Sequence, residues 1–277
     1  ERPMTEPALD IQQLAHTFNR GTPYETTALG GVDLTLEPGD FVVVLGSNGS
    51  GKSTLLNAIA GSLMAESGRI RVDGTDVSRW PAHRRARLIG RVFQDPFGGT
   101  AADMTVLENL AIASTRGLRR GLGRALARAR REELAEAVRR LGLGLENRLD
   151  TPMGLLSGGQ RQALTLLMAM LVRPGLLLLD EHTAALDPRS AELLLRLTQT
   201  FVSAERLTTM MVTHSMPQAV RLGNRILIMH RGVVAFDLSG PQKRRARVED
   251  LLARFEELRR SDMLDDPAAD LLRRAYV

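Results

Sequence analysis

The chain has 277 residues, of which 43% are hydrophobic, 4% are aromatic and none is cysteine, and its formal net charge is +5. The absence of cysteine excludes disulfides and thiolate metal sites, and the length fits one large domain or two small ones with a mainly aliphatic core. No segment approaches the roughly 20 apolar residues that cross a bilayer, and the first residues do not resemble a signal peptide.

The first part of the chain reads as strands joined by turns. Alternating or continuous apolar runs predict strands at residues 9–15, 32–36, 41–45, 68–72 and 88–93. The run at 41–45 is apolar throughout, which is typical of a parallel strand buried on both faces. A helix is predicted directly after it at residues 53–60, with Leu55, Leu56 and Ile59 facing inward.

The middle of the chain is dominated by helical periodicity. Helices are predicted at residues 106–114, 124–141 and 160–171. The second of these places Leu126, Leu134, Val138 and Leu141 on one side, and Ser157 is positioned to cap the third. These helices predict a helical subdomain, at about residues 97–155, inserted into an α/β core.

The core pattern resumes after the third helix. Strands are predicted at 176–180, 209–212 and 225–229, a hairpin at 232–237, and helices at 189–203 and 248–260. Together the elements predict an α/β fold with a mixed and mainly parallel sheet, an antiparallel β subdomain and the inserted helices.

One motif indicates which ligand the chain binds. Residues Gly46, Ser47, Asn48, Gly49, Ser50, Gly51, Lys52 and Ser53 fit G-x-x-x-x-G-K-[ST] at every fixed position. A strand precedes this loop and a helix follows it, which is the context of a phosphate-binding P-loop, so the predicted α/β fold has a P-loop NTPase core. We expect the loop amides and Thr54 to bind ATP, Lys52 to contact the β- and γ-phosphates, and Ser53 to ligate Mg²⁺.

Polar groups also follow three other predicted strands. Gln94 follows the strand at 88–93, Asp180 ends the strand at 176–180 with Glu181 directly after it, and Thr213 and His214 follow the strand at 209–212. Because ligands of open parallel sheets lie at the carboxyl ends of the strands, these groups are expected to meet the P-loop at one edge. Asp180 is expected to hold Mg²⁺ through water and Glu181 to orient and polarise the attacking water; the alternative is a carboxylate pair that caps the next helix.

A second motif carries a family resemblance. Leu156, Ser157, Gly158, Gly159 and Gln160 resemble the signature sequence of ATP-binding cassette (ABC) ATPases, and the resemblance extends from about residue 9 to residue 237. It implies that Ser157, Gly158, Gly159 and Gln160 contact the γ-phosphate of ATP bound to the opposite subunit of a homodimer.

The same resemblance implies roles for further residues. Gln94 is similar to the glutamine that senses Mg²⁺ and the γ-phosphate, and His214 to the switch histidine that contacts the γ-phosphate. Phe18 falls where the family stacks an aromatic ring on adenine, with Tyr24 as the alternative. Asp187 ends a segment similar to the family's D-loop.

Two features have both a functional and a structural interpretation. His182 stands where the family usually has proline; it either titrates near the site or, the interpretation favoured, replaces proline in a loop. This variant resembles a subgroup of bacterial import ATPases of aromatic amino acid-type systems. Residues 116–131 are strongly basic. They are interpreted either as a solvated helical face or as a surface that contacts anionic lipid or a permease loop. Nucleic-acid binding is disfavoured because no aromatic residues are interleaved for stacking.

The resemblance implies an ABC ATPase domain at residues 1–240 and a C-terminal helical extension at 241–277. The implied function is ATP hydrolysis that drives transport, with import favoured over export, through a separate integral-membrane permease served by an extracytoplasmic substrate-binding protein. The implied location is peripheral, on the cytoplasmic face of the inner membrane. The alternative is a soluble ABC ATPase of a cytosolic assembly system, such as iron–sulfur cluster assembly.

Overall fold

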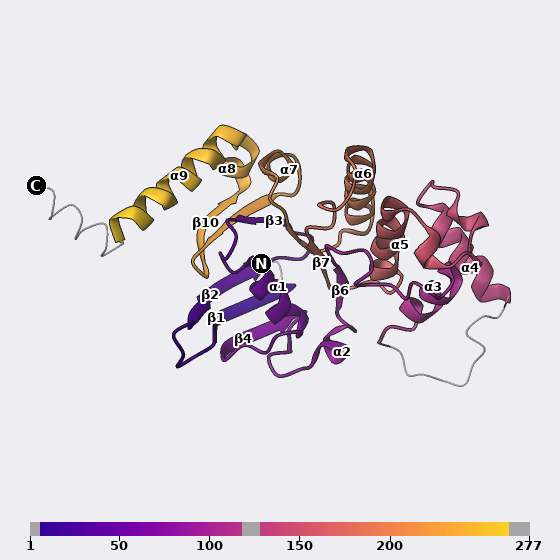
Figure 1. Cartoon of the computed structure of the whole chain (residues 1–277), viewed down its shortest axis with the longest axis horizontal. Coiled ribbons are helices and arrows are strands. Elements are labelled where there is room, and N and C mark those ends of the chain that lie inside the picture. The colour runs from indigo at the N-terminus through magenta and orange to yellow at the C-terminus, as the bar shows by residue number, and fades with distance from the viewer. Residues whose placement is uncertain (1–5, 118–127, 266–277) are drawn as a thin grey trace, which may run out of the picture.

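The structure is a computed structural model that describes residues 6–117 and 128–265 and contains two β-sheets (Figure 1). The smaller sheet is antiparallel, with the strand order β2 (Thr26–Leu36), β1 (Leu9–Phe18), β4 (Ser67–Val72) and β5 (Thr75–Asp76). The larger sheet has the order β10 (Val233–Ser239), β9 (Arg225–His230), β3 (Phe41–Gly46), β8 (Thr209–Val212), β7 (Leu176–Asp180) and β6 (Ile89–Val92). Every neighbouring pair in the larger sheet is parallel except β10 and β9.

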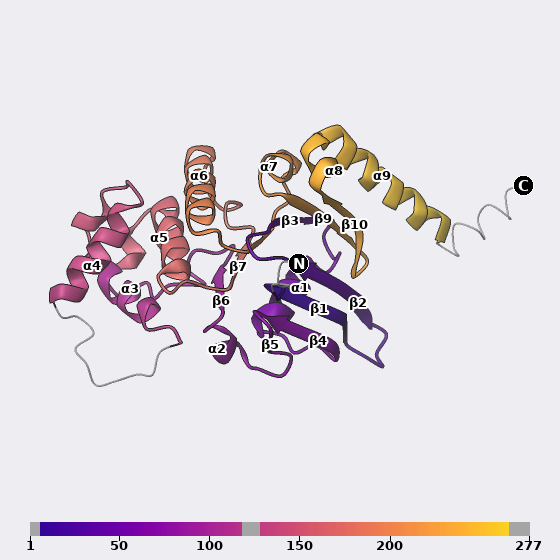
Figure 2. The same cartoon turned by 180° about the vertical axis from the view of Figure 1, so that it is seen from behind.

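Helices surround the larger sheet and extend from both of its ends. They are α1 (Lys52–Ala60), α2 (Ala82–Arg85), α3 (Val106–Ser114), α4 (Arg128–Arg139), α5 (Gly158–Met170), α6 (Pro188–Glu205), α7 (Met216–Arg221), α8 (Gly240–Arg245) and α9 (Val248–Asp265). Short 3₁₀ turns lie at Leu145–Asn147 and Met153–Leu155. Seen from either side, α3, α4 and α5 form one end of the molecule and α9 the other (Figures 1 and 2).

The larger sheet is buried on both faces, which explains its continuous apolar strands. In β3, Val43 and Leu45 belong to the core that contains α3 to α6, whereas Val42 and Val44 pack in a second core with α1 and the antiparallel sheet. Strand β7 divides in the same way, with alternate leucines on opposite faces. This two-sided burial fixes the strand ends, and with them the loops that leave the carboxyl edge.

The expected α/β architecture is confirmed, and most of the predicted strands and well-patterned helices lie within a few residues of the observed ones. Strand β2 begins six residues before the strand predicted at 32–36, and the hairpin predicted at 232–237 is the single strand β10, which pairs with β9. Leu55, Leu56 and Ile59 are fully buried, as are Val138 and, nearly so, Leu134 and Leu141. Leu126 lies outside the described residues. Strand β5 and helices α2, α7 and α8 were not predicted, because elements of two to six residues carry too little periodicity to be recognised.

The division into a domain at residues 1–240 and an extension at 241–277 stays a prediction. Within residues 6–117 and 128–265, no helix combines the length and the apolar composition that a membrane span requires.

Candidate active site

The loop between β3 and α1 forms a cradle of backbone amides. Gly51 precedes the helix with φ +99°, a left-handed conformation that glycine adopts without strain, and a Cβ there would collide with the carbonyl of Ala28. The first amides of α1 have no intrahelical acceptor and face the loop, which makes this helix end an anion site. The buried hydroxyl of Ser50 also has no hydrogen-bond partner. Unpaired donors around an open loop fit a bound phosphate.

Lys52 is held inside this loop. Its side chain is 5% exposed, and Nζ donates hydrogen bonds to the carbonyls of Gly46 and Ser47, both at 2.9 Å. Burial lowers the pKa of Lys52, while the nearby carboxylates of Glu181 and Asp180 act in the opposite direction. The ammonium is therefore fixed between the loop and the acidic end of β7.

Most of the predicted nucleotide-binding residues line one pocket of about 380 Å³. The predicted residues among its lining are Phe18, Asn48, Gly49, Ser50, Gly51, Lys52, Ser53, Thr54, Glu181 and His214. Gly46 and Ser47 line a neighbouring pocket of about 260 Å³, shared with His214 and α9. Phe18 is 40% exposed at the rim, whereas Tyr24 is 80% exposed and is absent from the lining.

Glu181 and His214 come from the loops after β7 and β8 and meet across the pocket. His214 Nε2 lies 2.5 Å from Glu181 Oε1. Glu181 has φ +44°, a strained conformation for a residue other than glycine, and its amide donates to the carbonyl of Val212 at 3.1 Å. The strand ends therefore aim this carboxylate at the pocket.

Asp180 has a partner that the sequence did not indicate. Its Oδ2 accepts a hydrogen bond from Arg91 on β6 at 3.1 Å, and the two side chains are only 14% and 12% exposed. The pairing follows from the parallel register of β6 and β7. Because 89 positions separate the two residues, no local pattern in the sequence signals this contact.

Ser157 to Gln160 lie outside the P-loop pocket of the same chain. Ser157 caps α5: its Oγ accepts from the amide of Gln160, and the Gln160 side chain accepts from the amide of Ser157. Ser157, Gly159 and Gln160 line a separate pocket of about 130 Å³ beside α6, and Gly158 lies against Leu186. The N-terminus of α5 is exposed at Ser157 and Gly158, so it can contact a ligand that this chain's own P-loop pocket does not hold.

Gln94 follows β6 at the expected edge of the sheet, but its side chain is exposed and is not part of the P-loop pocket. Asp187 caps α6 through the amides of Arg189 and Ser190. The structure thus brings the P-loop, Glu181 and His214 together and leaves Gln94 and residues 157–160 apart from them.

His182 is 1% exposed, and its Nε2 lies 3.2 Å from the Thr198 hydroxyl on α6. Burial lowers its pKa to about 4. A ring that stays neutral at ordinary pH and packs against a helix agrees with the structural interpretation of this residue.

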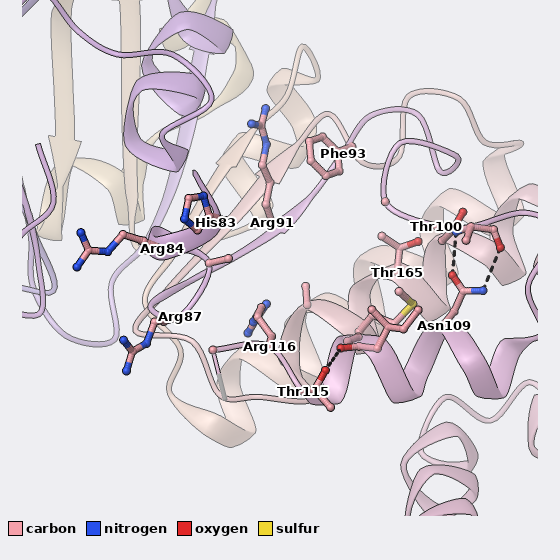
Figure 3. Close-up of a pocket in the computed structure, with 18 residues that line it drawn as sticks. His83, Arg84, Arg87, Arg91, Phe93, Thr100, Asn109, Thr115, Arg116 and Thr165 are labelled. Atoms are coloured by element: carbon pink, nitrogen blue, oxygen red, sulfur yellow. Dashed lines mark hydrogen bonds between the residues drawn. The ribbon is translucent and has the colours of Figure 1, made fainter. Parts of the chain in front are cut away.

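A groove of about 1030 Å³ separates β6 and α2 from α3 and α5. Figure 3 shows that Arg84, Arg87, Arg91, Arg116 and His83 lie along it. No aspartate or glutamate is among its described lining residues. The groove is therefore a concentrated basic surface, which sequence periodicity did not predict because it is assembled from four separate segments.

Comparisons with known proteins agree with these motifs. A family model described as "ABC transporter" matches residues 29–184. The chain is 40% identical over 248 residues to the tyrosine transport ATP-binding protein of Clostridioides difficile (strain R20291), covering 90% of this chain and 98% of that protein. It is 35% identical over 203 residues to the thiamine import ATP-binding protein of Shigella flexneri, covering 73% of this chain and 82% of that protein.

Solved structures give the same answer. A dimeric ATP-binding cassette in a post-hydrolysis state with ADP and Pi superposes with a TM-score of 0.72 at 27% identity, covering 83% of this chain and 98% of that chain. An ATP-binding cassette of an ABC transporter in its ADP conformation superposes with a TM-score of 0.73 at 25% identity, covering 90% and 96%.

Proposed function

The chain belongs to the ABC transporter family and is an ATP-binding, ATP-hydrolysing subunit, and we propose that it powers import through a separate membrane permease as a homodimer. The ATP-hydrolysing role is supported mainly by one observation: the side chains of Glu181 and His214 contact each other in the P-loop pocket. The 40% identity with a tyrosine transport ATP-binding protein supports import of an aromatic amino acid. No observation favours the iron–sulfur assembly alternative.

In the proposed reaction, ATP binds with its phosphates on the P-loop amides and on Lys52, and Phe18 contacts adenine. Glu181 orients the attacking water and accepts its proton, while His214 contacts the γ-phosphate and holds the Glu181 carboxylate in place. Ser157, Gly158, Gly159 and Gln160 of the other subunit complete the site; what supports this is that they form the start of a helix, with Ser157 and Gly158 exposed, and lie outside the P-loop pocket of their own chain.

The oxygen donors near the P-loop fit Mg²⁺. Ser53 offers a hydroxyl and Asp180 a carboxylate, which are ligand types that Mg²⁺ prefers. Among the described residues no group of three or more histidine, aspartate or glutamate side chains is arranged to hold a metal alone. Ser53 and Asp180 would therefore share the ion with phosphate oxygens and water, and the ion would neutralise phosphate charge. Gln94, the third proposed ligand, lies outside the P-loop pocket in this structure.

We propose that the permease docks in the arginine-lined groove. Gly99, Thr100 and Ala101, from the segment at 97–104, line the groove together with the arginines. Phe97, which begins this segment, is 52% exposed, and its ring centroid lies 3.7 Å from the Arg161 guanidinium carbon. An exposed aromatic ring and a basic groove offer the apolar and charged contacts of an interface. The proposed location is accordingly the cytoplasmic face of the membrane, with an extracytoplasmic binding protein delivering substrate.

Reconstitution tests this function. The purified chain, co-expressed with a candidate permease in lipid vesicles, is expected to hydrolyse ATP faster when the binding protein is loaded with tyrosine than when it is empty. Thiamine serves as the control substrate. Hydrolysis without any dependence on a permease would contradict the transport role and leave the ATPase assignment intact.

A further inference from the structure

We propose that Arg91 is a positioning residue that links occupancy of the arginine-lined groove to metal binding at Asp180. The inference rests on the proposed function in one respect, the docking of a permease segment in the groove. Arg91 lines the groove and also donates to the Asp180 carboxylate, so one side chain belongs to both places. In Figure 3 it extends beside Phe93, with its guanidinium turned away from Arg116.

The ion pair competes with a metal ion. Arg91 and Asp180 are almost buried, at 12% and 14% exposed, so water screens their charges weakly. A divalent cation at Asp180 would face a guanidinium of the same sign, which already occupies one oxygen, Oδ2, of the carboxylate. With the groove empty, Arg91 therefore lowers the affinity of Asp180 for the metal.

Arg91 is also incompletely satisfied. Its Nη2 donates to Asp180 and its Nη1 lies 3.4 Å from the Ser62 hydroxyl, but its buried Nε has no acceptor. Arg116 on the other side of the groove has an unpartnered buried Nε as well. A buried donor without an acceptor costs free energy, so both groups favour an incoming acceptor.

The charge of the groove defines the occupant. Arg84, Arg87, Arg91, Arg116 and His83 line it, and no aspartate or glutamate is among its described lining residues; Asp180, which pairs with Arg91, lies outside the lining. The matching partner is a permease segment that carries an acidic side chain. When that carboxylate pairs with Arg91, it neutralises or withdraws the cation next to Asp180, and the metal binds more readily.

The first test measures metal binding rather than turnover. Mn²⁺ is titrated into the full chain with saturating ADP, and free Mn²⁺ is followed by electron paramagnetic resonance. Arg91→Met is expected to lower the half-saturating Mn²⁺ concentration by about fivefold or more, because it removes the like charge and keeps an unbranched side chain of similar length. Arg91→Lys is expected to stay within about twofold of the unaltered chain. An unchanged or higher half-saturation in Arg91→Met would overturn the proposal, provided that thermal unfolding shows the variant folded.

The second test addresses the groove. Because the chain has no cysteine, His83→Cys supplies a single thiol on exposed α2. Labelling it with a sulfonate-bearing methanethiosulfonate reagent is expected to lower the half-saturating Mn²⁺ concentration, whereas the trimethylammonium reagent is expected not to. In His83→Cys combined with Arg91→Met, the two labels are expected to give the same value.

Two results would overturn the link between groove and metal. One is a half-saturating Mn²⁺ concentration that the sulfonate label leaves unchanged when Arg91 is present. The other is an equal response when Arg91 is replaced, since the label would then act on the metal directly. Neither measurement needs a permease or hydrolysis, so its failure is distinguishable from failure of the proposed transport function.

Discussion

The imidazole of His214 lies 2.5 Å from the carboxylate of Glu181, and both side chains line the pocket that contains Lys52. The two residues follow adjacent parallel strands, β7 and β8, so the contact is set by strand register rather than by flexible loops. A γ-phosphate or an attacking water that enters the pocket must contact one or both of these side chains. The contact thus couples the position of His214 to the group proposed to activate water.

Replacing the Glu181 carboxylate tests that role. Glu181→Gln is expected to lower ATP turnover by about 10²-fold or more, the scale of a lost general base. ATP binding is expected to persist, because Lys52 and the loop amides are unchanged. Steady-state hydrolysis and equilibrium nucleotide binding check the two parts. Glu192→Gln, an exposed carboxylate paired with Arg221, is the control and should keep normal turnover; normal turnover of Glu181→Gln would refute the assignment.

A mixing experiment tests whether residues 157–160 act on the partner's nucleotide. Ser157→Arg chains are mixed with Lys52→Ala chains, each inactive by itself. In the mixed dimer one site carries both changes and the other carries neither, so partial ATPase activity is expected to return. Crosslinking of Asn48→Cys chains to Ser157→Cys chains gives an independent readout in this cysteine-free protein. A dimer that never brings these two positions into crosslinking distance would rule out the head-to-tail arrangement.

The exposed ring of Phe97 provides a test of docking. Phe97→Asp is expected to release the permease or to abolish its stimulation of hydrolysis, because a charge replaces an apolar contact. The isolated variant should still bind ATP. Tyr24→Asp is the control, since Tyr24 is 80% exposed and lines neither the groove nor the P-loop pocket. Hydrogen exchange with and without permease should show protection near Phe97; protection confined to α9 would move the docking surface there.

The buried His182 predicts a pH dependence of stability. Burial lowers its pKa from 6.5 to about 4, so the unfolded chain takes up this proton at higher pH than the folded chain. The neutral ring therefore contributes stability that is complete above about pH 6.5 and is lost as pH falls toward 4. The loss amounts to about 3 kcal/mol at most. Urea unfolding between pH 7 and pH 5 checks this: His182→Gln is expected to lose part of the pH dependence, whereas exposed His83→Gln should retain it.

How far the sequence predicts this structure depends on the range of each interaction. Strand β3, helix α1 and the Ser157 cap were predictable because apolar period, glycine position and capping box are local signals. The contact between Glu181 and His214 was predictable because residues that follow parallel strands gather at the carboxyl edge of the sheet. The Arg91–Asp180 pair and the arginine-lined groove were not predictable, since they depend on register and on packing between distant segments. That Phe18 lines the pocket and Tyr24 does not likewise depends on where the strand ends relative to the pocket.

The two lysines have a practical consequence. Lys52 and Lys243 are the only lysines in the sequence, and both are buried, at 5% and 6% exposed, with each ammonium bonded to backbone carbonyl oxygens. The side chains of the folded protein therefore offer almost no accessible primary amine. The rate at which an amine-modifying reagent reacts with these lysines would therefore depend on conformational opening rather than on their static exposure. The rate of reductive methylation at Lys52 would then report how often the empty P-loop opens, and bound nucleotide should slow it.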